Sequence, residues 1–354
     1  TIGGFSSATI TTVSNASGGT GLESITSIKY NAPRDYSAQD RAVTAEDYKT
    51  LVKSLYANAQ AVQVYGGEDA ETPDYGKVYI SIKAKSGSNL TTATKESLVQ
   101  SLKQYAVASV TPVIIDPETT YITLVVSFKY NSNLTTKDVS TLQTNVLTKV
   151  ASYNNDTLED FAGMFRYSKL IEAVNDADTS ILSNITTVKM YKYFTPTLNS
   201  GIKYTLSYNN ALYNPHSGHN SSGGGVISSS GFKVNNDSSL NEHFLDDDGA
   251  GNLRLYYLSG TTRVYTDTTY GTVNYTTGEV VLTSAHITSI SNVDGATSTQ
   301  VRVFATPSSN DVVPVRNQVL SIDTSNSTIT GEVDGIESGS SQAGTTYTTT
   351  SSYS

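Results

Sequence analysis

The hydrophobic pattern between residues 44 and 85 changes from a helical to a strand-like period, and this change constrains the fold most strongly. Thr44 precedes apolar residues at helical spacing, and Asp47 stands where a capping box places its acid. Two strand-like segments follow at 61–65 and 77–85, and the second carries Val, Ile or Ala at every other position. A chain with this order is neither all-helical nor all-β, so the sequence predicts an α+β fold.

The pentapeptide SNLTT occurs twice, at 88–92 and at 132–136. In both places an alternating strand precedes it and an amphipathic helix follows it. In the second copy we expect Thr135 to be the N-cap and Asp138 to complete a capping box. The repeat indicates two tandem α/β-sandwich modules, each resembling a split β-α-β unit with helices on one face. The alternative is that Leu-Thr-Thr is simply a common way to begin a helix.

Beyond residue 201 the helical pattern disappears and short strand-like segments predict an antiparallel β-domain. Residues 275–279 read as a hairpin turn with Gly278 at the position that needs a positive φ. Residues 324–354 are rich in Ser, Thr and Gly and nearly devoid of apolar side chains. Such a segment cannot bury enough surface to fold alone, so we expect an extended tail, held by a neighbouring subunit wherever it is ordered.

These patterns predict five parts in the chain. They are the end of a preceding β-domain with a linker (1–40), the first α+β module (41–118), the second α+β module (119–200), the antiparallel β-domain (201–323) and the extended tail (324–354). The sequence does not begin with Met and shows no signal-like segment at its start. We therefore expect it to be an internal or C-terminal piece of a longer protein.

The composition excludes several classes of partner. The net charge is −9, with 23 Lys and Arg against 32 Asp and Glu, which argues against nucleic-acid binding and against binding to an anionic membrane. Cysteine is absent, so disulfides and thiolate metal sites are impossible. Charged residues make up only 16% and tyrosine is frequent, with 24 residues, which suits a surface for protein–protein contact. An extracellular β-rich chain would show the same bias.

Candidate chemical sites are few. His216 and His219 form the only close histidine pair in the sequence, but they lie in a Gly/Ser-rich segment without a third ligand nearby. Residues 246–252, DDDGAGN, lack the spaced ligands and distant Glu of a calcium loop and predict a tight acidic turn. Neither a Gly-x-Ser-x-Gly elbow nor a Walker loop occurs. We expect no catalytic residue, no cofactor and no metal ion.

A resemblance to a known family is clear from about residue 18 to residue 204. The segment ESITSIKYNAPRDYSAQDRAVTAEDYKTLV, with YGKVYISIKAKSG and SNLTT downstream, resembles the baseplate J-like family. It is most similar to the C-terminal part of the large inner-baseplate wedge proteins of T4-type contractile-tailed phages. The residues that carry this likeness are Ala32-Pro33-Arg34, Arg41-Ala42-Val43-Thr44, Asp47-Tyr48, Gly76, Ser86-Gly87 and Leu90-Thr91-Thr92. The ordered series, rather than one motif, is specific, and the likeness weakens after residue 204.

The resemblance implies a structural, non-enzymatic component of the virion tail baseplate, made in the host cytoplasm. Proteins of this kind pair with copies of themselves, link wedges around the hub, and contact other baseplate wedge proteins and the tail hub or tube region. We expect an interface on the first predicted helix, formed by Tyr48, Leu51, Leu55 and Tyr56, and on exposed faces of the β-domain. The alternatives are a receptor-binding or adhesin-type tail protein, and a tail enzyme such as a wall hydrolase.

Overall fold

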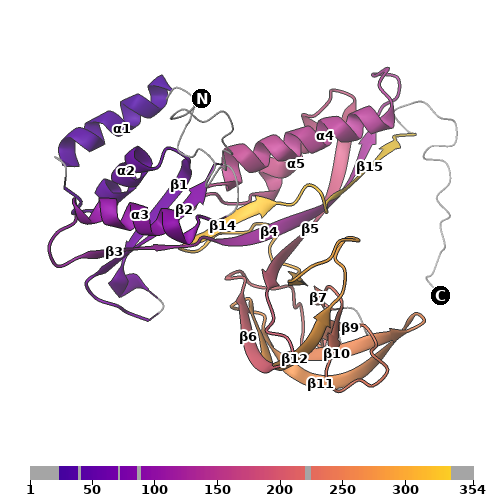
Figure 1. The fold of residues 1–354 in the computed structure, drawn as a ribbon. Coiled ribbons are helices and arrows are strands. Elements are labelled where there is room, and N and C mark those ends of the chain that lie inside the picture. Colours follow the sequence, from indigo (N-terminus) through magenta and orange to yellow (C-terminus); the bar gives the residue numbers. More distant parts are fainter. Residues whose placement is uncertain (1–23, 39–40, 71, 86–88, 220–224, 336–354) are drawn as a thin grey trace, which may run out of the picture. The chain divides into compact units, whose positions relative to one another are not determined.

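The computed structural model describes residues 24–335, except 39–40, 71, 86–88 and 220–224. The strand expected within residues 1–23 and the last part of the predicted tail therefore lie outside the described residues. The chain divides into two compact units, unit 1 (residues 1–117) and unit 2 (residues 118–354), shown in Figure 1. Each unit has its own cluster of buried side chains, so each is described by itself.

Unit 1 is a small α/β sandwich. Its elements, in order, are α1 (Ile25–Ala38), α2 (Ala45–Leu55), β1 (Ala59–Gly66), a 3₁₀ turn (Gly67–Asp69), β2 (Lys77–Ala84), α3 (Thr92–Lys103) and β3 (Thr111–Ile115). The sheet has the order β1-β2-β3, in which β1 and β2 are antiparallel and β2 and β3 are parallel.

The alternation in β2 explains which face of this sheet is covered. Val64 lies opposite Ile80 in the ladder between β1 and β2. Both side chains are buried in one cluster with Tyr48 and Val52 of α2 and with Leu102 of α3. The apolar stripes of the two helices therefore meet the apolar face of the sheet, as the period change in the sequence predicts.

Unit 2 begins with a second α+β layer. β4 (Glu118–Tyr130) is followed by α4 (Val139–Tyr153), a π-turn (Asn154–Leu158), α5 (Tyr167–Asn175) and β5 (Ile181–Phe194). β4 and β5 are antiparallel, and their inward residues, such as Leu124 and Phe128, are buried with Leu142, Val146 and Leu170 of the two helices. β4 followed by α4 repeats the order of β2 followed by α3 in unit 1. However, β4 pairs antiparallel with the next strand, β5, whereas β2 pairs parallel with β3.

An antiparallel barrel is inserted between β5 and β13. Its strands are β8 (Phe232–Val234), β9 (His243–Asp247), β10 (Asn252–Ser259), β11 (Thr262–Asn274) and β12 (Glu279–Ile290), in the order β11-β10-β9-β8-β12, and pairing of β11 with β12 closes the ring. β6 (Gly201–Ser207) extends this sheet from β12. Gly278, in the turn between β11 and β12, has a φ of 74° and fills the position for which the sequence predicts a positive φ.

The remaining strands complete the six-stranded sheet around β4 and β5. They are β7 (Ile227–Ser229), β13 (Val301–Ala305), β14 (Gln318–Ile322) and β15 (Thr328–Val333). The order is β14-β4-β5-β13-β7, and β15 pairs with β4 beyond the end of β14. β14 and β15 run parallel to β4, whereas the other pairings in this sheet are antiparallel.

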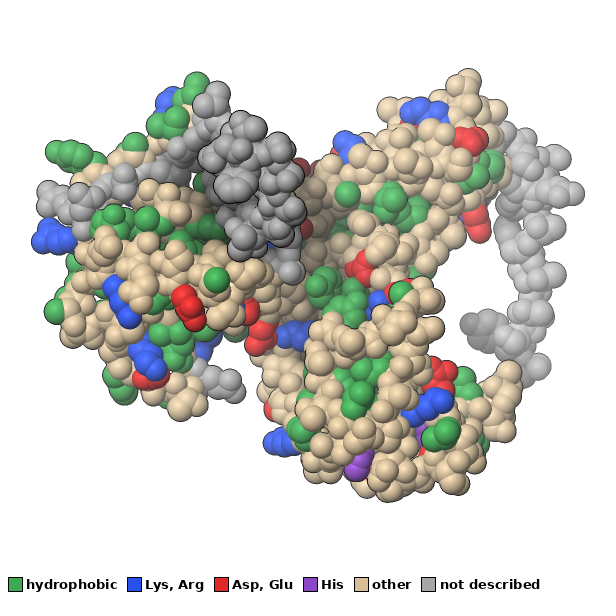
Figure 2. All heavy atoms as spheres, in the orientation of Figure 1, with side chains coloured by type: hydrophobic (Ala, Val, Ile, Leu, Met, Phe, Trp, Pro, Cys, Tyr) green, Lys and Arg blue, Asp and Glu red, His purple; other side chains and the backbone are tan. Residues whose placement is uncertain are grey.

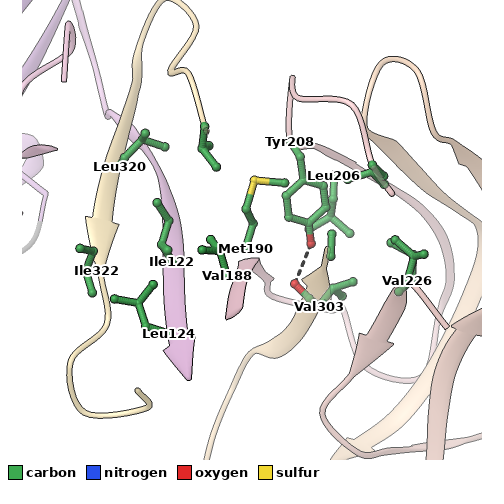
Figure 3. Close-up of a cluster of buried hydrophobic side chains, with 14 of the residues drawn as sticks. Ile122, Leu124, Val188, Met190, Leu206, Tyr208, Val226, Val303, Leu320 and Ile322 are labelled. Atoms are coloured by element: carbon green, nitrogen blue, oxygen red, sulfur yellow. Dashed lines mark hydrogen bonds between the residues drawn. The ribbon is translucent and has the colours of Figure 1, made fainter. Parts of the chain in front are cut away.

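One continuous core joins this sheet to the barrel. Figure 3 shows Ile122, Leu124, Val188 and Met190 packed beside Leu320 and Ile322 of β14, and Tyr208 near Val303 and Leu206. The Tyr208 hydroxyl donates to the Val303 carbonyl at 2.6 Å, and burial raises the pKa of this phenol. Without this hydrogen bond the buried Tyr208 hydroxyl would lack a partner, which would destabilise the core.

Side-chain oxygens accept hydrogen bonds from backbone N–H groups where the chain passes from β14 to β15. The Asn154 side-chain oxygen, presented by the π-turn after α4, accepts from the Ile322 N–H at 2.6 Å. The Asp323 carboxylate accepts from the N–H groups of Ser325 and Asn326 at 3.1 Å, and the Ser327 hydroxyl accepts from the Leu124 N–H at 3.0 Å. Residues 328–333, assigned to the extended tail from the sequence, thus form a strand on β4 of their own chain.

Candidate assembly surfaces

The start of α2 is a closed capping box. Thr44 is the N-cap, and its hydroxyl accepts from the Asp47 N–H at 3.3 Å. The Asp47 carboxylate accepts in return from the N–H groups of Thr44 at 2.8 Å and Val43 at 3.1 Å. Burial opposes ionisation, but these hydrogen bonds are decisive and lower the pKa of Asp47. Both residues therefore shape the helix rather than a chemical site.

The helix face predicted as an interface is divided between core and surface. Tyr48 and Leu51 are buried in the core of unit 1, so their prediction as interface residues is wrong. Tyr56 is half-buried against the same core, and Leu55 is 37% exposed. An apolar helical stripe looks the same in a sequence whether its own sheet or a partner covers it.

The second predicted cap is displaced by three residues. α4 begins at Val139 with Asp138 as its N-cap, and the Asp138 carboxylate accepts from the Thr141 N–H at 3.1 Å. The prediction of Thr135 as the cap is wrong, because its hydroxyl accepts from the Lys137 N–H in a turn before the helix. In the first copy of the repeat, Thr91 does cap α3. A carboxylate is the stronger acceptor, and it decides where α4 starts.

Asp178 joins the approach to α4 to the start of β5. It accepts from the Lys137 ammonium at 2.5 Å and from the Ser180 N–H at 3.0 Å. These hydrogen bonds, with Lys137 the larger cause, lower the pKa of Asp178 from 3.8 to about 2.

Unit 2 is therefore expected to lose stability as the pH falls from about 4 to about 2, because the unfolded chain takes up this proton first. A carboxylate whose pKa is lower in the folded protein stabilises the fold fully at pH values above its pKa in the unfolded chain. This stabilisation is lost at pH values below its pKa in the folded protein. Lys137 is about half-exposed, so screening limits the effect to about 1 kcal/mol. Urea unfolding between pH 5 and 2 should show a shallower decline for Asp178→Asn. Asp156→Asn, at an exposed carboxylate, is the control, and an equal change in both variants would contradict the assignment.

Part of one face of the six-stranded sheet in unit 2 is exposed. α4 and α5 cover the opposite face, which carries Leu124 and Phe128. On the open side Val125 is 51% exposed and Ile185 is 76% exposed, although both sit on central strands. We name this region the open sheet face and define it by Val125, Ser127, Ile185, Thr187 and Thr330, which the strand register places together. Two large aliphatic side chains left in water on a flat face are typical of a protein contact.

A largely buried aromatic cluster lies next to these residues on the same strands, and its central members, Tyr191 and Arg302, are 1% and 6% exposed. The rings of Tyr121 and Tyr191 stack with their centroids 5.0 Å apart, and Tyr193 meets Tyr191 edge-on at 5.3 Å. The Arg302 guanidinium lies 5.0 Å from the Tyr191 ring centroid and 5.5 Å from that of Tyr193. Because Tyr191 bonds Asp323 and Arg302 bonds Asp294 of the same chain, this cluster stabilises the sheet rather than offering a free contact surface.

A second exposed apolar surface lies on α1. Ile25, Ile28 and Tyr36 are all largely exposed, and together with the exposed Ala32 they fall on one side of the helix. We name these four residues the α1 face. A helix with an uncovered apolar stripe matches the usual helix-in-groove mode of recognition.

The remaining candidates support no chemistry. His219 Nδ1 lies 3.3 Å from His216 Nε2, and within the described part of the chain no group of three or more His, Asp or Glu side chains is arranged to hold a metal ion. No helix among the described residues is long and apolar enough to cross a bilayer. On the face shown in Figure 2, acidic and basic side chains are interspersed.

The acidic segment is more than a turn. Asp248 does form the turn, accepting from the N–H groups of Ala250 and Asn252. Asp246 and Asp247, however, are buried in β9, so the prediction of a simple acidic turn is wrong for them. Asp247 accepts from the Tyr275 hydroxyl at 2.6 Å.

Asp246 is the centre of a buried polar network. It accepts from Arg254 Nε at 2.9 Å, from Arg263 Nη1 at 2.6 Å and from the Tyr265 hydroxyl at 2.9 Å. The Arg254 guanidinium lies 4.4 Å from the Tyr265 ring centroid, and that of Arg263 lies 4.7 Å from the Tyr256 ring centroid. The network ties β9, β10 and β11 of the barrel together.

Comparisons with known proteins match the two α+β layers. Residues 44–115 match the family model "Baseplate structural protein gp6, C-terminal domain I", and residues 118–193 match "Baseplate structural protein gp6, C-terminal domain III". Baseplate wedge protein gp6 of Enterobacteria phage T4 is 33% identical over 193 residues, which are 53% of this chain and 29% of that protein. This chain thus spans less than a third of that relative's length. A chain in the cryo-EM structure of the anti-feeding prophage (AFP) baseplate aligns with this chain at a TM-score of 0.35 and 13% sequence identity. The alignment covers 47% of this chain and 37% of that chain.

Proposed function

Because residues 44–115 and 118–193 carry two C-terminal domains of the gp6 family of baseplate structural proteins, we propose that this chain is a structural wedge component of a contractile-tail baseplate in the virion. The observation that carries this proposal is the order of the two domain matches, which cover both α+β layers of the fold. The chain would act by holding neighbours in place and not by catalysis.

The proposed partners are copies of the same chain, other baseplate wedge proteins and the tail hub or tube region. Two uncovered apolar surfaces support these contacts, the open sheet face and the α1 face. We assign the contact between copies to the open sheet face, because a two-fold contact uses the same patch on both partners. Val125 and Ile185 would form the apolar centre of such a patch, with the hydroxyls of Ser127, Thr187 and Thr330 around it.

Cross-linking in intact particles tests this assignment. The chain contains no cysteine, so Ile185→Cys introduces a single thiol at the centre of the open sheet face. We expect this variant to give a dimer of the chain under mild oxidation or with a short bifunctional maleimide. Lys149→Cys, on the exposed side of α4, is the matched control and should remain monomeric. A dimer from Lys149→Cys alone, or from neither variant, would contradict the proposed contact while leaving the domain assignment intact.

The structural role has a separate test. The purified chain should release no product from peptidoglycan or glycans over a long incubation. Measurable turnover would refute the non-enzymatic reading, and cross-links found only to a distal fibre would favour the receptor-binding alternative.

A further inference from the structure

Sulfur is scarce in this chain, and its two methionines lie in opposite environments. Cysteine is absent, so Met164 and Met190 carry all of the sulfur. Met190, on β5, has no exposed surface, whereas Met164, between the π-turn and α5, is 39% exposed. Methionine is oxidised where an oxidant can reach its thioether. Met164 is therefore the methionine that is open to a small oxidant in the folded chain.

The backbone beside Met164 is fixed by hydrogen bonds. Phe165 and Val312 form an antiparallel bridge, with N–H to carbonyl distances of 2.9 and 3.0 Å between them. Both side chains are buried, and the register sets Met164 opposite Val313, which is 41% exposed. The Asn210 side chain accepts from the Val313 N–H and donates to the Val313 carbonyl, both at 3.0 Å. Met164 and Val313 thus form an exposed apolar pair on a firmly held backbone.

A guanidinium group faces the sulfur atom of Met164. Arg166 Nη2 donates to Met164 Sδ at 3.6 Å, and Arg166 Nη1 donates to the Asp311 carboxylate at 2.9 Å. Asp311 also accepts from the Tyr167 N–H at 2.9 Å, at the first residue of α5. A thioether is a weak acceptor, so Nη2 has a poor partner in the reduced protein. An oxygen atom added to the sulfur would give this donor a strong, charge-assisted hydrogen bond.

The oxidation itself needs only a peroxide. A lone pair of Met164 Sδ attacks one oxygen of hydrogen peroxide, and the S–O bond forms as the O–O bond breaks. The departing hydroxide takes the proton of the transferred oxygen and leaves as water, so sulfur loses two electrons and the peroxide gains them. We propose that Met164 is a site of reversible oxidation to the sulfoxide, and that Arg166 holds the new oxygen. The sulfoxide replaces half of the exposed apolar pair by a strong dipole. This inference does not depend on the structural role in the baseplate.

The test treats the folded full chain with dilute hydrogen peroxide and follows each methionine by mass spectrometry. The two methionines fall in different tryptic peptides, since Arg166 and Lys189 lie between them. We expect Met164 to gain one oxygen at least about tenfold faster than Met190, because a buried thioether reacts only when the structure opens. In concentrated urea the two rates should become equal. A mixture of the two methionine sulfoxide reductases should then remove the oxygen from Met164.

Two variants and one NMR measurement locate the product. Met164→Leu keeps the volume and should abolish the fast oxidation, whereas Met190→Leu is the matched control and should leave it unchanged. The side-chain N–H resonances of Arg166 should shift when the sulfoxide forms. Those of Arg254, which donates to Asp246 in the barrel, should not move. The melting temperature should not fall, because the oxidised side chain is exposed.

Three results would overturn the proposal. They are equal oxidation rates of Met164 and Met190 in the folded chain, unchanged Arg166 resonances after oxidation, and unfolding caused by oxidation of Met164 alone. Each of these leaves the cross-linking result and the domain assignment unaffected, so the two proposals fail separately.

Discussion

Asp246→Ala is expected to lower the free energy of unfolding of unit 2 by about 3–5 kcal/mol, because it leaves a buried guanidinium without its counter-charge. The Arg254 side chain is 8% exposed and that of Asp246 is 1% exposed. Arg254 keeps its hydrogen bond to the Asp247 carbonyl but loses the carboxylate, and Arg263 and Tyr265 lose the same acceptor. Urea unfolding followed by far-ultraviolet circular dichroism measures the change.

Two controls distinguish the cost of leaving a buried charge unpaired from the cost of losing an ion pair in general. Glu172→Ala removes the carboxylate of an exposed pair with Lys169 in the same unit and should leave the free energy of unfolding nearly unchanged. The double variant Asp246→Leu with Arg254→Met removes both buried charges and should recover most of the stability, since apolar replacements of a buried pair are often neutral. If the double variant were as unstable as Asp246→Ala, packing rather than charge would explain the effect.

Leu102→Ala is expected to destabilise unit 1 by about 2–5 kcal/mol, the usual range for a fully buried leucine. Leu102 has no exposed surface and sits in a cluster that shares no member with the core of unit 2. Calorimetry of the full chain should therefore resolve two transitions, of which only one moves in this variant.

Leu55→Ala is the matched control for Leu102→Ala. Leu55 lies in the same unit but is 37% exposed, so its truncation should cost well under half as much. A single transition that shifts as a whole in Leu102→Ala would show that the two units unfold together.

The parts of the fold that follow from local sequence were predictable. The capping box of Thr44 and Asp47 and the two-residue period of β2 require only neighbouring residues, and the structure has both. The positive φ of Gly278 is likewise a property of its own turn. These signals indicate the α+β layers and the β-rich region that follows them.

Pairings between distant segments were not predictable. β14 and β15 lie about 200 residues from β4 in the chain, and a parallel ladder leaves no hairpin signal between its strands. Residues 328–333 contribute little apolar surface, so composition alone predicts a tail there. Backbone hydrogen bonds to β4, the Gln143 amide donating to the Ile329 carbonyl and the paired hydroxyls of Ser127 and Thr330 hold them instead.

The candidate sites show the same division. Tyr48 and Leu51 were predicted at an interface because burial by a sheet and burial by a partner require the same helical pattern. Asp246 was predicted in a turn because acids beside Gly usually lie in one. The missed signal was Arg254, which pairs directly with Asp246 across the hairpin.

The parallel pairing of β14 and β15 with β4 determines how the sheet responds to tension. β4 begins at Glu118 and β15 ends at Val333. The points where the chain enters and leaves this sheet therefore lie at opposite ends of one parallel ladder. Pulling on these ends slides the strands along their own axes, which loads the ladder's hydrogen bonds together in shear instead of breaking them one at a time. The barrel, inserted between β5 and β13, lies outside this shortest path. A pulling force applied between these two points can therefore pass through the sheet without unfolding the barrel.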